Sequence, residues 1–164
     1  MTDRPLWAPW RIEYITGPKD GGCIFCAAAA ARNEEPAQQP IDRTEHCLTM
    51  LNAFPYAPGH VMVAPVRHVG ALEELTEDEM LESMQLASRS IRAIRMAMNP
   101  DGFNVGYNLG KVAGAGIADH LHLHVVPRWS GDGNFMAVIA GTNVIPQALE
   151  ATREVLVQAI AQLP

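Results

Sequence analysis

The sequence lacks any long apolar run. It has 164 residues, of which 48% are hydrophobic and 18% charged, and no stretch reaches the ~18 consecutive apolar residues of a membrane-spanning helix. The first residues also lack the apolar core of a secretory signal. We therefore expect a cytoplasmic protein with no membrane partner. The same proportions exclude an intrinsically disordered chain.

The sequence also lacks a basic excess. Twelve Lys and Arg face 18 Asp and Glu, for a formal net charge of −6, whereas modules that bind nucleic acid duplexes usually carry an excess of positive charge. We expect no nucleic-acid partner, although a small molecule with phosphate groups needs only local donors. There is no internal repeat or low-complexity linker. The length then predicts a single domain over residues 1–164, with an irregular arm over about 1–22.

Cysteine is scarce and odd in number. With three cysteines and no visible export signal, a disulfide framework is not expected. Cys47 stands alone in an apolar stretch and is predicted to be a small buried hydrophobe. Cys23 and Cys26 form a CxxC pair, which is typical of redox or metal sites and also occurs without function. A structural zinc site needs four ligands, so this pair would need two more.

Short apolar segments separated by turn residues predict strands at 46–51, 60–65, 103–109 and 119–127. Such strands, with one long helix between pairs of them, favour an antiparallel sheet in an α+β fold.

Three helices are expected around this sheet. Thr76 begins a capping box with Glu79, and apolar residues then recur at three- and four-residue steps until a stop at 99–100. The methionines of this helix are expected in the core. A short helix over 27–32 should follow the CxxC pair, and a closing helix is expected over 147–162.

Three histidines carry the strongest chemical signal. His120, His122 and His124 alternate with apolar residues, so a strand would place all three on one face, with neighbours ~6.6 Å apart. Two uses compete for this face: a three-histidine metal site, or nucleophilic attack by an imidazole on an α-phosphorus. A nearby loop with Gly114 and Gly116 could offer backbone N–H groups to phosphate, although it is not a Rossmann fingerprint.

This alternation of histidine with apolar residues resembles the signature of the histidine triad (HIT) nucleotidyl hydrolases and transferases. The resemblance covers roughly residues 7–160, because residues 52, 58–65, 102–110 and 126–128 also match the family in order. Other segments are similar to the diadenosine tetraphosphate phosphorylase-type branch; these are 102–110, 124–129, 132–135 and 144–147. The resemblance implies a HIT-like fold, with about five antiparallel strands, one long helix and a C-terminal helix, and a homodimer.

The resemblance also implies roles for individual residues. His122 would be the nucleophile that forms a nucleotidyl-phosphohistidine, and His124 would hydrogen-bond the leaving or entering phosphate oxygens. His60 matches a supporting histidine behind the triad. Asn108 matches the phosphate-contacting amide, and Asn52 matches a residue near the ribose and phosphate.

For the metal, the resemblance implies that His68 and His120 complete one structural zinc site per chain with Cys23 and Cys26. The sequence departs from the family where Gly116 and Ile117 replace a polar pair before the first histidine of the triad. Backbone N–H groups of the glycine loop could substitute, and the extra space could admit inorganic phosphate as the acceptor.

We therefore expect a nucleotide-binding enzyme that cleaves a dinucleoside polyphosphate or a related nucleotide, by phosphorolysis or hydrolysis. Two alternatives stay open. The first is a nucleotide-sensing or scaffold protein with incidental nucleoside phosphoramidase activity, and the second is a hydrolase with a catalytic zinc ion.

Overall fold

The computed structural model describes residues 22–30, 39–132 and 148–164. At its centre is a five-stranded antiparallel sheet in which the strands follow the order β1-β2-β3-β5-β4. This confirms the predicted α+β architecture, and most of the expected arm at 1–22 lies outside the described residues. The strands are β1 (Asp42–Arg43), β2 (Cys47–Leu51), β3 (Val61–Pro65), β4 (Gly102–Tyr107) and β5 (Leu123–Arg128).

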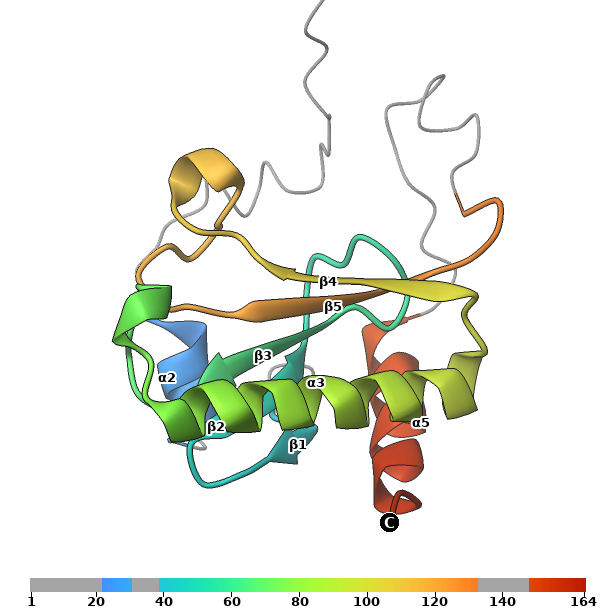
Figure 1. The fold of residues 1–164 in the computed structure, drawn as a ribbon. Helices are drawn as coiled ribbons and strands as arrows, with labels where there is room; N and C mark the ends of the chain where they lie inside the picture. The colour runs from blue at the N-terminus through green and yellow to red at the C-terminus, as the bar shows by residue number, and fades with distance from the viewer. Residues whose placement is uncertain (1–21, 31–38, 133–147) are drawn as a thin grey trace, which may run out of the picture.

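The described residues form three α-helices beside the sheet: α2 (Ile24–Ala29), α3 (Glu77–Met98) and α5 (Leu149–Ala161). In Figure 1, α3 runs along the sheet and α5 crosses behind α3, while α2 lies near one end of the sheet. Two short 3₁₀ helices, η2 (Leu72–Glu74) and η3 (Lys111–Ala113), lie in connecting segments.

The two faces of the sheet have different partners, because alternate residues of a strand point to opposite faces. On one face, buried residues of β2, β3 and β5 pack against α3 and α5. On the other face, Met62 and Ala64 of β3 join Phe25 of α2 in a second cluster. His124 of β5 pairs with Met62, so its side chain lies on the α2 face.

The predicted start of the long helix is confirmed. The Thr76 side chain accepts a hydrogen bond from the Glu79 N–H, and the Glu79 side chain accepts one from the Thr76 N–H. The helix ends at Asn99, whose φ of 47° is left-handed and stops the helical repeat.

The prediction that the helix methionines lie in the core is wrong for Met80 and Met84, which are 43% and 56% exposed. The buried stripe is displaced around the helix and consists largely of small residues, which let α3 approach the sheet closely. Its members are Glu79, Ser83, Leu86, Ala87, Ser90, Ala93 and Ile94.

Local sequence patterns predicted the other strands and helices, and the structure corrects the bounds of two of them. Three predicted strands match β2, β3 and β4 to within two residues, and α5 matches the closing helix. The short helix begins at Ile24, inside the CxxC pair rather than after it. The last strand begins at Leu123 and not at residue 119, because the preceding residues leave the sheet and Leu121 N–H donates to the Val69 carbonyl.

The loop after β3 therefore lies beside the segment that leads into β5. A Cβ atom on Gly70 would lie 3.1 Å from the Ala118 carbonyl oxygen, so glycine permits this close approach of two backbones. The contact brings His68 next to His120. Among the residues that the structure describes, no helix is long and apolar enough to cross a membrane.

Candidate active site and metal centre

Four side chains predicted as metal ligands converge at the junction of α2, the loop after β3 and the segment before β5. The ligand atoms of Cys23, Cys26, His68 and His120 all lie within 4.8 Å of one another. Cys23 Sγ lies 3.2 Å from His120 Nδ1, and Cys26 Sγ lies 3.2 Å from His68 Nδ1. The two Nδ1 atoms are also 3.2 Å apart.

This donor set fits zinc. Neighbouring ligand atoms in a tetrahedral Cys2His2 site lie about 3.3–3.8 Å apart, because the metal–ligand bonds are about 2.0–2.3 Å long. His120 Nε2 donates to the Pro65 carbonyl at 2.8 Å, which leaves a lone pair on Nδ1 facing the sulfur atoms. Burial, assisted by the neighbouring His68 and His122, lowers the pKa of His120 and so favours the neutral imidazole that binds metal.

Cys47 lies apart from this cluster and is fully buried in the core under α3, as predicted. Burial raises the pKa of its thiol to about 12, so the side chain is a neutral thiol at physiological pH.

His122 lies between the metal cluster and His124. Its Nδ1 is 2.8 Å from the backbone carbonyl oxygen of His120. A carbonyl can only accept a hydrogen bond, so in the neutral ring the proton resides on Nδ1 and the lone pair on Nε2. Its ring centroid lies 4.8 Å from that of His124, in an edge contact.

A chain of hydrogen bonds fixes the proton on His124. The Tyr56 backbone N–H donates to His60 Nδ1 at 3.1 Å, so His60 carries its proton on Nε2. That nitrogen lies 2.9 Å from His124 Nδ1, which therefore accepts. The proton of a neutral His124 is then on Nε2, 3.4 Å from Asn108 Nδ2.

Asn52 supports this chain from behind. Its Oδ1 accepts from the Phe54 N–H at 2.9 Å, and its Nδ2 lies 3.4 Å from His60 Nδ1. The side chain is 8% exposed. The structure thus places Asn52 in the turn that orients His60, and the role near ribose and phosphate stays a prediction.

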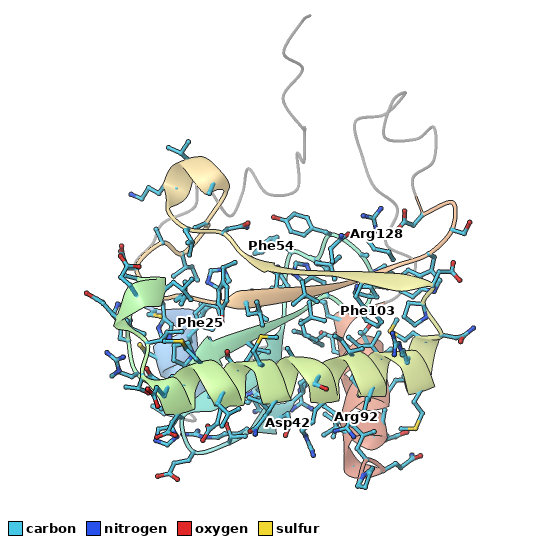
Figure 2. The ribbon with its side chains drawn as sticks, in the orientation of Figure 1. Phe25, Asp42, Phe54, Arg92, Phe103 and Arg128 are labelled. Atoms are coloured by element: carbon cyan, nitrogen blue, oxygen red, sulfur yellow. The ribbon has the colours of Figure 1, made fainter. Side chains whose placement is uncertain are left out.

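A cavity of about 1120 Å³ opens over β4 and β5 and has His124, Asn108 and Gly114 in its lining. This volume exceeds the ~300–1,000 Å³ of common small-molecule pockets. At its far end Arg128 donates to Asn104 Oδ1 at 2.9 Å and forms an ion pair with Asp132. Figure 2 shows Arg128 on the opposite side of the sheet from Arg92 of α3.

Our reading of the sequence missed Arg128 and Tyr56 as cavity residues. The first could have been found by extending the alternation from His124 by four residues along the same strand face. Tyr56 contributes a backbone N–H and a ring stacked on His60 at 5.0 Å, and turn residues give no periodic signal for such contacts.

In this structure the backbone N–H of Gly114 has a partner within its own loop, and its contact with phosphate stays a prediction. That N–H donates to the Lys111 carbonyl at 3.0 Å, and the Ala115 N–H donates to the Gly110 carbonyl at 3.2 Å. The 3₁₀ turn η3 thus uses these donors internally. Gly116 is exposed in the same loop, and its contact with phosphate stays a prediction.

The geometry separates the two uses that compete for the three histidines. His120 directs Nδ1 toward two cysteines and His68, while His124 is bonded to His60. The three rings therefore do not share one metal site, and the arrangement favours a four-ligand metal centre beside a two-histidine reaction site.

Comparisons with known proteins agree with this geometry. A family model for the HIT domain matches residues 33–131. AP-4-A phosphorylase from Mycobacterium tuberculosis is 42% identical over 166 residues, which cover 97% of this chain and 85% of that protein. Adenosine 5'-monophosphoramidase from Saccharomyces cerevisiae is 30% identical over 109 residues, or 66% of this chain and 64% of that protein.

A solved structure shares the fold. The crystal structure of a zinc-bound histidine triad family protein from Mycobacterium smegmatis matches with a TM-score of 0.70 and 31% sequence identity. The match covers 86% of this chain and 94% of that one.

Proposed function

Since the chain belongs to the HIT domain family, we propose that it is a nucleotide-binding enzyme that cleaves a dinucleoside polyphosphate, such as diadenosine tetraphosphate, at an α-phosphorus. Two lines of support converge. The relative in M. tuberculosis is named as a phosphorylase of AP-4-A. In this chain the His122 ring, with its directed lone pair, contacts His124, and His124 lines a large cavity.

In the first step, His122 Nε2 attacks the α-phosphorus. The new N–P bond forms as the P–O bond to the remaining polyphosphate breaks, and the electron pair leaves with that oxygen. The observation that carries this proposal is the hydrogen bond from His122 Nδ1 to the His120 carbonyl. It leaves the nucleophilic lone pair on Nε2, and the carbonyl can also stabilise the positive charge that develops on the ring.

His124 assists at the oxygen atoms of the phosphate groups. Because Tyr56 and His60 fix its tautomer, it presents an N–H donor from Nε2, and Asn108 lies beside that donor. In the second step, phosphate or water attacks the phosphohistidine, the N–P bond breaks, and His122 recovers its lone pair. The nucleotide leaves as a diphosphate or a monophosphate, respectively.

One zinc ion per chain is proposed to occupy the cluster of Cys23, Cys26, His68 and His120. Four protein ligands leave no open coordination position, so zinc supplies structural cross-linking and no reaction chemistry. Elemental analysis of fresh protein, prepared without chelator, should find about one zinc per chain. Protein without bound metal would contradict this assignment.

The whole chain, residues 1–164, is proposed to form a single HIT domain that assembles as a homodimer. Two observations support a second copy as the partner. Met80, Leu81 and Met84 form an exposed apolar surface on α3, and β4 is an edge strand with Val105 43% exposed. A cytoplasmic location is also proposed, because a reducing compartment keeps the cysteine ligands as thiols.

Product identification tests the function. Incubation with diadenosine tetraphosphate and millimolar phosphate should yield ADP and ATP, and a slower reaction without phosphate should yield AMP and ATP. If neither condition cleaves the substrate, the proposal is wrong.

The yeast monophosphoramidase relative supports a second candidate, a sensing or scaffold protein that hydrolyses nucleoside phosphoramidates slowly. In that case adenosine phosphoramidate would be turned over faster than the dinucleotide, and protein partners would be retained after His122→Gly.

A further inference from the structure

Phe25 lies between the two cysteines of the metal cluster and touches the proposed nucleophile. Its side chain is fully buried. The Phe25 ring centroid lies 5.0 Å from that of His120 and 5.0 Å from that of His122, with interplanar angles of 46° and 32°. Both distances are within the range of direct aromatic contact.

The position of this ring depends on a short element. Helix α2 has six residues, and no side chain caps its first turn. Isolated helices of this length are unstable in water, so α2 depends on its packing against the sheet and on the two cysteines that flank Phe25. A metal bound by Cys23 and Cys26 would anchor both sides of Phe25.

The His122 ring is bordered by three groups that could control its rotation. The His120 carbonyl accepts from Nδ1, His124 meets the ring edge, and Phe25 packs against it. The His120 carbonyl belongs to a residue of the metal cluster, and Phe25 lies between the two cysteines of that cluster. In-line attack requires the reacting atoms to be held near ~3–3.5 Å in one orientation.

We propose that Phe25 is a positioning residue that couples the metal cluster to His122. Metal binding by Cys23 and Cys26 fixes the Phe25 ring, and the ring restricts rotation of the imidazole so that Nε2 faces the α-phosphorus. This inference rests on the proposed role of His122. It assigns a function to the residue inside the CxxC pair beyond filling the core.

The test uses Phe25→Leu, which keeps an apolar side chain but removes the ring. The matched control is Phe103→Leu, the same substitution in β4, where Phe103 packs against the α3 side of the core and contacts Arg95. Figure 2 shows Phe25 and Phe103 at opposite ends of the sheet. Both variants are first loaded with zinc and checked for folding by circular dichroism.

Two readouts separate positioning from stability. With zinc bound, Phe25→Leu should lower kcat for diadenosine tetraphosphate about tenfold with KM within about twofold, whereas Phe103→Leu should leave both within about twofold. NMR spectra of ring-labelled histidine, assigned with His122→Gly, should show displaced His122 ring signals in Phe25→Leu only. Equal effects of the two substitutions on kcat, or an unchanged His122 ring signal in Phe25→Leu, would overturn the proposal.

Chelation then tests the coupling. Removing zinc from folded wild-type protein should shift the His122 ring signals, and the same treatment of Phe25→Leu should shift them less than half as far. An equal shift in both proteins would mean that the metal acts through His120 alone, which overturns the role of Phe25. If chelation unfolds the wild-type protein, the comparison of the zinc-loaded variants decides the question.

The failure of the proposed function gives a different result. In that case the wild-type holoenzyme would not cleave the dinucleotide at all, while the His122 ring signals would still report whether Phe25 positions the imidazole.

Discussion

A neutral imidazole has one donor and one acceptor nitrogen, and its contacts decide which is which. In this protein a backbone carbonyl makes Nδ1 the donor in His122. A backbone N–H makes Nδ1 the acceptor in His60. The two imidazole rings are therefore protonated on different nitrogens. The free lone pair on Nε2 suits His122 as a nucleophile, and the N–H on Nε2 of His60 donates to His124 and fixes its tautomer.

The relay predicts the effect of removing His60. A His60→Gln variant should lose the bond that fixes His124, and kcat should fall about 10-fold to 100-fold, because a correctly placed acid contributes about 10²–10⁴-fold. KM should change little. The measurement is steady-state kinetics with diadenosine tetraphosphate.

The matched control is His46→Gln, because His46 pairs with Glu82 on α3 and not with the triad. It should retain nearly full activity. Equal losses in both variants, or a rise in KM without a fall in kcat, would contradict the relay.

A substitution of Gly116 tests whether inorganic phosphate, rather than water, accepts the nucleotidyl group. A glutamine at this exposed loop position should occupy the space proposed for inorganic phosphate. Gly116→Gln should therefore lower the phosphate-dependent rate more than the rate with water, measured as ADP against AMP release. Val112→Gln is the control, because Val112 is fully exposed in the same loop. A proportional fall in both rates would contradict the acceptor site.

At the scale of elements, an ion pair joins the segment before β2 to α3. His46 Nδ1 lies 2.8 Å from Glu82 Oε1, and the His46 N–H donates to Oε2 at 2.7 Å. The hydrogen bond with Glu82 raises the pKa of His46 above 6.5. The same bond lowers the pKa of Glu82 from 4.5 to about 2.

These shifts fix the sign of a pH effect. The raised pKa of His46 adds stability below pH 6.5, which is lost as the pH rises through the folded-state pKa. The lowered pKa of Glu82 adds stability above pH 4.5, which is lost as the pH falls toward 2. The pair therefore stabilises most between about pH 4.5 and pH 6.5.

Urea unfolding of wild type and Glu82→Gln at about pH 5.5 and about pH 8.5 checks this. The free energy of unfolding lost in the variant should be larger at the lower pH. Glu77→Gln, at an exposed position of the same helix, should show no such difference between the two pH values. A loss that is equal at both pH values, or larger at about pH 8.5, would contradict the assignment.

The helices and strands that were predicted correctly are those whose formation depends on residues close together in the sequence. The capping box at Thr76 and the apolar strands β2 and β3 depend on residues close in sequence. The exposure of Met80 and the start of β5 depend on distant partners. The side of α3 that packs against the sheet carries small residues, which sequence periodicity alone did not indicate. The Leu121 N–H donates to the Val69 carbonyl, so Leu121 lies outside strand β5. The cluster of Cys23, Cys26, His68 and His120 was predicted because family motifs join positions that local patterns leave separate.

At the scale of the whole molecule, the exposed apolar surface of α3 predicts a second copy. Light scattering at micromolar concentration should return a dimer mass for the wild type. Met84→Lys, which places a charge among Met80 and Leu81, should shift the mass toward the monomer. Val112→Lys, in the loop η3, should stay dimeric. A monomeric wild-type protein would contradict the homodimer.

We propose that His122 carries the nucleotidyl group between the donor nucleotide and the acceptor. The most direct measurement mixes the protein with diadenosine tetraphosphate without phosphate, quenches it in alkali within one turnover, and locates the adduct by peptide mass spectrometry. We expect an adenylyl group on the peptide at His122, absent from His122→Gly and discharged as ADP when phosphate is added before the quench. Turnover without an adduct, or an adduct on another residue, would contradict this role of His122.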